Sequence, residues 1–161
     1  MAIQSGADQK DRTKAVLFCR EASKADLPAI LTLFAQPDLD NGEVLPLFEA
    51  EPIFERMARY PNYTLYVAVY GDHVIGTYAL LIMDNLGHLG APSAVIEDVA
   101  VDPAWQGRGV GTMMMNHALE IASAKGCYKA MLSSNLKRER AHPFYESLGF
   151  ERHGYSYRVS I

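Results

Sequence analysis

Two kinds of hydrophobic pattern alternate along this chain. Runs of β-branched and aromatic residues predict strands, and apolar residues that recur every three or four positions predict helices. The predicted strands cover residues 15–20, 63–70, 73–83, 94–101, 127–134 and 150–159. One predicted helix begins after the capping residue Ser23, and three others cover residues 49–59, 109–125 and 141–148. The order of elements is therefore β-α-α-β-β-β-α-β-α-β.

The connections between these elements indicate an α/β domain with a mixed sheet. Gly71-Asp72 is a tight turn, so strands 63–70 and 73–83 form an antiparallel hairpin. Strand 94–101 is joined to strand 127–134 through a helix, which favours a parallel, right-handed crossover. No repeat or linker divides the chain, so we expect one domain over residues 15–161. Residues 1–14 are expected to form a flexible polar tail.

Composition and charge exclude several classes of partner. The chain is 49% hydrophobic and 21% charged, as is ordinary for a globular protein, and its net charge of -4 argues against nucleic acid. The one tight basic cluster, Lys137, Arg138 and Arg140, encloses an acid and could meet one or two phosphates. No apolar run approaches the roughly 18 residues that span a bilayer, and no signal peptide is recognisable.

The cysteines indicate a reducing compartment and no metal site. Cys19 and Cys127 show neither a disulfide framework nor metal-ligand spacing, so both are interpreted as small packing residues. We therefore expect a cytoplasmic protein without a bound metal.

A glycine-rich segment between a strand and the longest helix is the main candidate for ligand binding. It reads Gln106-Gly107-Arg108-Gly109-Val110-Gly111. Its glycines let the backbone approach a ligand, and free N–H groups of the first helical turn favour phosphate or pyrophosphate. The dinucleotide fingerprint is excluded because the spacing is G-x-G-x-G and the next strand ends in 133–135 without an acid. A Walker loop is excluded because Gly111, not Lys, precedes Thr112.

Two motifs resemble the GNAT superfamily of acyl-CoA-dependent N-acetyltransferases. Its Q/R-x-x-G-x-G/A signature corresponds to Gln106, Gly109 and Gly111, directly after the segment IEDVAVDP. Its A-x-x-FYE-x-LGF hallmark corresponds to residues 141–150, AHPFYESLGF. The resemblance implies a GNAT fold over residues 15–161, with a mixed, mostly antiparallel sheet of about six to seven strands and flanking helices.

The resemblance also implies acetyl-CoA as cosubstrate. The pyrophosphate would lie on N–H groups between Gln106 and Thr112, and the pantetheine arm between strands 94–101 and 127–134, which would part. Asn135 would bond a pantetheine amide, or merely end its strand. The implied cofactor-binding residues are Val99, Ala100, Val101, Gln106, Gly107, Arg108, Gly109, Val110, Gly111, Thr112, Asn135 and Phe144.

An amine must lose a proton before it can attack a thioester, because an alkylammonium has a pKa near 10. Glu97 is the best candidate base, because it interrupts an otherwise apolar strand. Strict alternation would put Glu97 on the face of Val95, Val99 and Val101, and Asp98 on the other. Asp98 is the second candidate. Either acid could instead be buried and satisfied by a structural partner such as an arginine.

Two further roles follow from the family resemblance. Such strands bulge near the acids, which would free the Val99 N–H for a developing oxyanion. Tyr145 matches the usual proton donor to the leaving thiolate, although it could merely pack. No nucleophilic relay is needed, so we expect direct transfer in a ternary complex.

The acceptor amine is open. The segments IEDVAV and GCYK resemble hexosamine-phosphate N-acetyltransferases, whereas the spacing of LSSNLKRERAHPFY resembles aminoalkylphosphonate N-acetyltransferases. The basic cluster at 137–140 could hold a substrate phosphate, the 3′-phosphate of coenzyme A, or only water. An acidic segment with Asp38, Asp40, Glu43, Glu49 and Glu51 could attract a cationic amine, or simply be exposed.

Two other functions fit the same residues: a silent acetyl-CoA-binding regulatory module and a protein or peptide N-acetyltransferase. A homodimer that pairs through the final strand is expected, because Tyr155, Tyr157 and Val159 alternate there.

Overall fold

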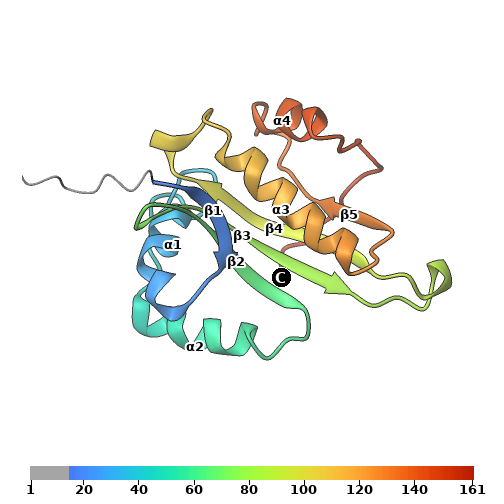
Figure 1. Ribbon diagram of the computed structural model, residues 1–161, viewed down its shortest axis with the longest axis horizontal. Helices are drawn as coiled ribbons and strands as arrows, with labels where there is room; N and C mark the ends of the chain where they lie inside the picture. Colours follow the sequence, from blue (N-terminus) through green and yellow to red (C-terminus); the bar gives the residue numbers. More distant parts are fainter. Residues whose placement is uncertain (1–14) are drawn as a thin grey trace, which may run out of the picture.

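A single mixed sheet organises the computed structural model, which describes residues 15–161 (Figure 1). Its strands are β1 (Leu17–Glu21), β2 (Tyr63–Tyr70), β3 (His73–Met83), β4 (Ser93–Val101) and β5 (Lys129–Leu132), in the order β1-β2-β3-β4-β5. Neighbours are antiparallel from β1 to β4, and β5 is parallel to β4. The predicted hairpin and the predicted parallel crossover are both confirmed. The predicted tail, residues 1–14, lies outside the described residues.

Within residues 15–161, four α-helices flank the sheet: α1 (Leu27–Phe34), α2 (Leu47–Met57), α3 (Val110–Ala124) and α4 (Ala141–Ser147). Short 3-10 turns cover Lys24–Asp26, His88–Gly90 and Pro103–Trp105. The first α-helix begins later than its predicted capping residue, Ser23, indicated. Ser23 caps the 3-10 turn, and α1 begins only at Leu27, with a proline in its first turn.

The two faces of the sheet carry separate hydrophobic clusters, because side chains alternate along each strand. On one face, Tyr78, Leu80 and Ile96 pack with Met114 of α3, and α4 joins this side through Phe144 and other residues. On the opposite face, Val67 and Ala79 pack with Ile30 of α1 and with residues of α2. The sheet is thus covered by α3 and α4 on one side and by α1 and α2 on the other (Figure 1).

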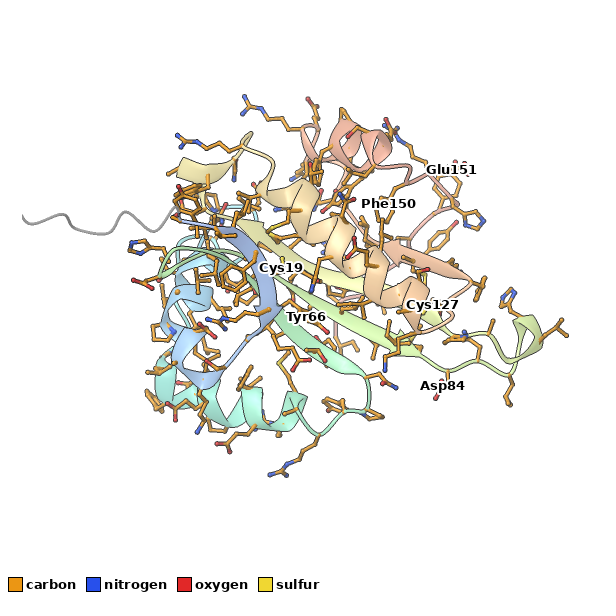
Figure 2. All side chains as sticks on the ribbon, in the orientation of Figure 1. Cys19, Tyr66, Asp84, Cys127, Phe150 and Glu151 are labelled. Atoms are coloured by element: carbon orange, nitrogen blue, oxygen red, sulfur yellow. The ribbon has the colours of Figure 1, made fainter. Side chains whose placement is uncertain are left out.

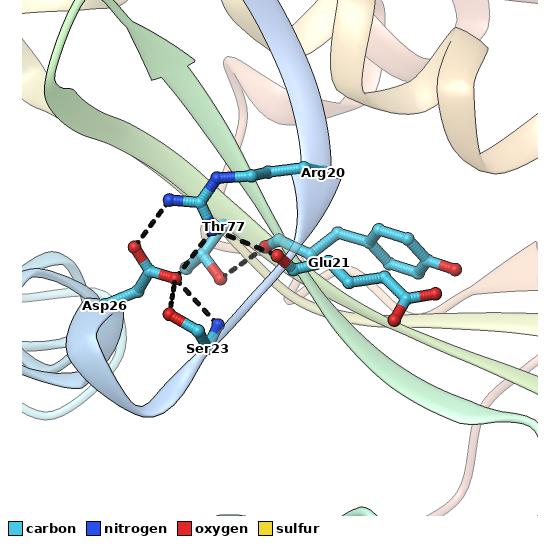
Figure 3. Close-up of polar contacts among 6 residues, drawn as sticks. Arg20, Glu21, Ser23, Asp26 and Thr77 are labelled. Carbon is cyan, nitrogen blue, oxygen red and sulfur yellow. Dashed lines mark hydrogen bonds and ion pairs between the residues drawn. The ribbon is translucent and has the colours of Figure 1, made fainter.

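A closed polar cluster fixes the junction between β1 and α1 (Figure 3). The Arg20 guanidinium donates to both carboxylate oxygens of buried Asp26, at 2.7 and 2.8 Å. Ser23 donates to the same carboxylate through its backbone N–H at 2.7 Å and its hydroxyl at 2.8 Å. These bonds, above all those from Arg20, hold the pKa of Asp26 well below its usual range.

The predicted final strand, residues 150–159, is wrong. No strand is assigned after α4 in the described residues, so the sheet has five strands and not six or seven. Tyr155, Tyr157 and Val159 are 90%, 89% and 83% exposed. Alternation supplies a strand's side-chain pattern, but a strand also needs a neighbour for its N–H and C=O groups, and this segment has none within residues 15–161.

The two cysteines lie far apart and are free. Figure 2 shows Cys19 on β1 and Cys127 beyond the far end of α3. Both are partly buried, and burial raises the pKa of Cys19 to about 11 and also raises that of Cys127. Among residues 15–161, no helix combines the length and the hydropathy that crossing a membrane would require.

Candidate active site

The glycine-rich loop leads into α3 with a conformation that only glycine adopts easily. Gly107 and Gly109 have φ of 71° and 82°, in the left-handed region. Within residues 15–161, the backbone N–H groups of residues 106–112 donate no hydrogen bond. A row of free donors at the N-terminus of a 15-residue helix is suited to an anion such as a diphosphate.

Gly111 is needed for a different reason. A Cβ there would lie 3.0 Å from Cζ of Phe144, so only a residue without a side chain lets α4 pack this closely on the first turn of α3. The same contact brings Tyr145, the next residue of α4, towards the start of α3. Neither the packing of Gly111 on Phe144 nor its effect on α4 was visible in the sequence, where all three glycines were interpreted as ligand-approach positions.

Two glutamines anchor the end of β4 next to this loop. The Val101 carbonyl oxygen accepts hydrogen bonds from Nε2 of Gln106 at 3.1 Å and from Nε2 of Gln36 at 3.2 Å. On the other side of the loop, the Arg108 guanidinium lies 5.5 Å from the Trp105 ring. The motif glutamine therefore ties the loop to β4, while its own backbone N–H stays free.

A β-bulge interrupts β4 at the two acids, as expected. Thr77 pairs with Ala100 and Ala79 pairs with Glu97, so Asp98 and Val99 together oppose one residue of β3. Asp98 has φ of 53°, a conformation uncommon for a residue with a side chain. The extra residue changes which face each later side chain occupies.

The bulge overturns the expected placement of the acids relative to the valines. Glu97 pairs with Ala79, which belongs to the cluster under α1 and α2, whereas Val99 and Val101 pack on the α3 side. Glu97 therefore does not share a face with Val99 and Val101. Strict alternation fails because the inserted residue inverts the pleat at Asp98.

The expected parting of β4 and β5 is present. The two strands pair over Ser93–Ile96 and Lys129–Leu132 only, and β4 continues to Val101 without a neighbour on that side. We call this place the β4–β5 fork, defined by residues 97–101 and 133–135. On the side away from β3, the backbone of β4 in the fork faces no strand partner, as an added extended ligand would require.

The acids at the bulge are exposed and not buried in a strand core. The described residues contain no salt bridge to Glu97 or Asp98, so the structural alternative of a buried arginine partner is wrong. Although Asp98 is exposed by surface area, protein atoms around its carboxylate desolvate it in part, and this effect, followed by the charge of Asp40, raises the pKa of Asp98. Partial burial raises the pKa of Tyr63, and the charges of Asp98 and Glu97 add to the effect.

Tyr145 is half-buried among aromatic rings on the other side of the fork. Its ring lies 5.1 Å from that of Phe144 and 5.8 Å, edge on, from that of Phe150, which Figure 2 labels just after α4. Burial raises the pKa of Tyr145, and the nearby Arg138 charge opposes this in part. No hydrogen bond or salt bridge in residues 15–161 joins Tyr145 to Glu97.

Residues after β5 close the far side of the fork. The Asn135 side-chain oxygen accepts the Lys137 N–H at 2.9 Å and so shapes the turn into α4. Ser134 has a buried hydroxyl oxygen without a hydrogen-bond partner among the described residues. Such a group calls for an acceptor or donor that the protein itself does not supply. No motif in the sequence singled out Ser134.

The loop between α1 and α2, residues 35–46, reaches three parts of this site. Gln36 bonds the end of β4, Asp38 pairs with Arg138 at 3.5 Å, and Asp40 lies close enough to Asp98 to raise its pKa. The sequence indicated an acidic segment here but not its contacts, because these join residues about 60 to 100 positions apart. Among the described residues, no group of three or more His, Cys, Asp or Glu side chains could hold a metal ion.

Comparison with known proteins finds N-acetyltransferases among the similar sequences. Glucosamine 6-phosphate N-acetyltransferase of Trypanosoma brucei brucei is 38% identical over 88 residues, which are 55% of this chain and 58% of that protein. Aminoalkylphosphonate N-acetyltransferase of Salmonella typhimurium is 28% identical over 101 residues, 63% of this chain and 65% of that protein. The matches thus span less than two thirds of each of these relatives.

Solved structures extend the likeness over nearly the whole chain. A crystal structure of a Trypanosoma brucei acetyltransferase matches with a TM-score of 0.77 and 30% sequence identity. The match covers 91% of this chain and 100% of that chain. The family model described as "Acetyltransferase (GNAT) family" matches residues 27–150, which include the glycine loop, the bulge and α4. The chain therefore belongs to the GNAT acetyltransferase family.

Proposed function

We propose that this protein transfers the acetyl group of acetyl-CoA directly to a primary amine of a small molecule. The observation that carries the proposal is the row of free N–H groups at residues 106–112, next to the fork where β4 loses its neighbour. The first feature suits a diphosphate and the second suits an extended amide chain, and coenzyme A contains both.

The residues of the loop and the fork fit the proposed cosubstrate. The diphosphate would accept from the N–H groups of Gln106 to Thr112, and the left-handed glycines leave the backbone open to it. The pantetheine arm would pair with β4 at Val99, Ala100 and Val101, with Asn135 across the fork and Phe144 beneath the loop. The Ser134 hydroxyl, which has no partner in the described residues, is a further donor there.

The thioester of acetyl-CoA supplies the acetyl group, and residues of this chain handle the protons. Glu97 is exposed at the bulge and takes a proton from the substrate ammonium, directly or through water. Asp98, one residue on, is the second candidate. The Val99 N–H at the bulge is proposed to donate to the carbonyl oxygen as negative charge develops there.

Tyr145 is proposed to donate a proton to the departing thiolate. A tyrosine phenol, with a pKa near 10, is protonated at neutral pH as a general acid must be, and burial keeps the pKa of Tyr145 above that value. A thiol pKa near 8.5 makes the thiolate a tolerable leaving group, so this proton assists the reaction without being indispensable. No covalent intermediate on the protein is required, and both substrates are bound together.

The proposed acceptor is a small amine, and the relatives favour one that also carries phosphate or phosphonate. Glucosamine 6-phosphate and an aminoalkylphosphonate are the acceptors named for two of them. The test is release of free coenzyme A thiol from acetyl-CoA with aminosugar phosphates, aminophosphonates, polyamines and aminoglycosides. Thiol release with at least one class, and an N-acetylated product by mass spectrometry, supports the proposal.

Two other functions would give different results in this assay. A regulatory module would bind acetyl-CoA in calorimetry but release no thiol with any amine. A peptide N-acetyltransferase would acetylate peptide N-termini or lysines in preference to small amines. The exposed acids at the bulge, free of salt bridges within residues 15–161, favour the enzyme over the silent module.

We further propose a homodimer that pairs through the C-terminal segment. Tyr155, Tyr157 and Val159 alternate there and are almost fully exposed, and β5 is the last strand of the sheet in the described residues. A segment with alternating apolar side chains and a free sheet edge are complementary in a second copy. Light scattering should give a dimer mass for the whole chain and a monomer mass after removal of residues 152–161.

A further inference from the structure

Arg138 occupies an unusual position between the catalytic region and the acidic loop. Its side chain is 28% exposed, and its charge acts on Tyr145. Its backbone is fixed at the start of α4, because its N–H donates to Asn135 and its carbonyl accepts from Ala141, both at 2.9 Å. The backbone of Arg138 is therefore held next to residue 135 of the fork, and its guanidinium lies near Asp38 of the acidic loop.

The ion pair that Arg138 makes is weak. Nε of Arg138 lies 3.5 Å from the Asp38 carboxylate, and the Asp38 side chain is 66% exposed. The two terminal nitrogens of this guanidinium, Nη1 and Nη2, make no hydrogen bond within residues 15–161. An exposed ion pair through one nitrogen contributes little to stability. A phosphate that accepts from both terminal nitrogens through two oxygens would therefore displace Asp38 from Arg138.

Charge around the site sets the orientation of any acceptor. Glu97 and Asp98 lie at the bulge, and Asp40 lies close to Asp98. This acidic side attracts an ammonium group and repels a phosphate. The charge of Arg138 acts on Tyr145, and its guanidinium pairs with Asp38, two residues before Asp40, whereas Arg108 lies over Trp105 at the glycine loop.

We infer that Arg138 is the residue that binds the anionic group of a zwitterionic acceptor, an amine that bears a phosphate or phosphonate, in exchange for Asp38. The inference rests on the proposed acetyl transfer and adds its acceptor class and the residue that selects it. In the absence of acceptor the guanidinium rests in its weak pair with Asp38, and the ammonium end of a bound acceptor is directed to Glu97.

The anion site can be tested without catalysis, by calorimetry with glucose 6-phosphate, which has no amine, and with glucose as its neutral partner. Glucose 6-phosphate should bind at least about tenfold more tightly than glucose, and Arg138→Gln should remove most of this difference. Arg140→Gln is the matched control, because Arg140 is a neighbouring, exposed arginine with no salt bridge in the described residues. Equal binding of the two sugars would overturn the inference.

Kinetics then test selection between acceptors. The ratio of kcat/KM for 2-aminoethylphosphonate to that for propylamine should fall about 30-fold in Arg138→Gln and stay unchanged in Arg140→Gln. Asp38→Asn removes the competing carboxylate, so KM for the phosphonate should fall about threefold. A rise in that KM, or an unchanged ratio in Arg138→Gln, would overturn the inference.

Two outcomes separate this inference from its alternatives. Arg138→Gln that weakens binding of coenzyme A but not of dephospho-coenzyme A would assign Arg138 to the 3′-phosphate and overturn the acceptor role. Absence of thiol release by the parent protein with every amine would overturn the proposed function alone, because glucose 6-phosphate binding would still report on the anion site.

Discussion

Asp26 and Asp98 are the same type of residue in two regions that treat a carboxylate in opposite ways. Asp26 is buried at the β1–α1 junction, where Arg20 and Ser23 satisfy it and lower its pKa. Asp98 lies on the bulge with a left-handed φ, without a salt bridge in the described residues, and its pKa is raised. In the first region polar groups pair with each other and stabilise the fold, whereas in the second they are left unpaired and free to bind a ligand.

The largest effect is expected at the bulge, in Glu97→Gln. The amide cannot accept the ammonium proton, so kcat/KM should fall about 100-fold at pH 7, and the deficit should shrink as pH rises towards the amine pKa. Initial rates of thiol release across pH measure this, with Glu120→Gln on the exposed side of α3 as control. A parent-like rate at pH 7 would remove Glu97 from the mechanism.

The next effect is on stability, at the satisfied acid. Asp26→Asn leaves Arg20 and Ser23 without their shared carboxylate and should lower the free energy of unfolding by about 2 kcal/mol. For a chain of this length this is roughly 4 to 8 °C in Tm by calorimetry. Asp72→Asn, in an exposed turn, is the control and should change Tm little.

The difference in unfolding free energy between the parent and Asp26→Asn should shrink at low pH. Because the folded-state pKa of Asp26 is lowered, its contribution is fully present above about pH 4, the unfolded value, and is lost as pH falls further. The stability gap between the parent and Asp26→Asn should therefore narrow steadily as pH falls from about 4 to 2, and close only near the lowered folded-state pKa of Asp26. A gap that stays constant down to pH 2 would contradict the ion pair with Arg20.

A smaller effect on turnover is expected at Tyr145. Tyr145→Phe keeps the packing on Phe144 and Phe150 but removes the acid, so kcat should fall about tenfold while the Kd for coenzyme A stays close to the parent value. Tyr128→Phe, whose ring stacks on His88 outside the site, serves as control. A change in Kd with unchanged kcat would assign Tyr145 to packing alone.

The smallest effect is expected in Asp98→Asn, and its sign is opposite to that in Asp26→Asn. Asparagine tolerates the left-handed φ and carries no charge beside Asp40, so stability at pH 7 should rise by about 0.5 kcal/mol. Because the folded-state pKa of Asp98 is raised, its ionised form destabilises the parent. As pH falls through that pKa, Asp98 is protonated and the parent regains the lost stability. Chemical denaturation at pH 7 and pH 4 measures both values, and a loss of stability at pH 7 would contradict the contrast with Asp26.

The sequence predicted the elements whose signals are local. The hairpin at Gly71-Asp72, the long helix after the glycine loop and the helix with Tyr145 appear where the patterns put them, within about two residues. The presence of a bulge and the parting of β4 and β5 came from family motifs and are also present. The final strand failed, because a strand exists only with a neighbour, and the residues near 150–161 do not encode one locally.

Contacts between distant segments were decided only by the tertiary structure. The sequence determined that free donors stand at the head of α3 and that two acids interrupt β4. It could not determine which face each acid takes, because one inserted residue inverts the pleat, nor that Asp38 meets Arg138 and Phe144 covers Gly111. Local propensity acts over a few residues, whereas these contacts depend on how whole elements pack against each other.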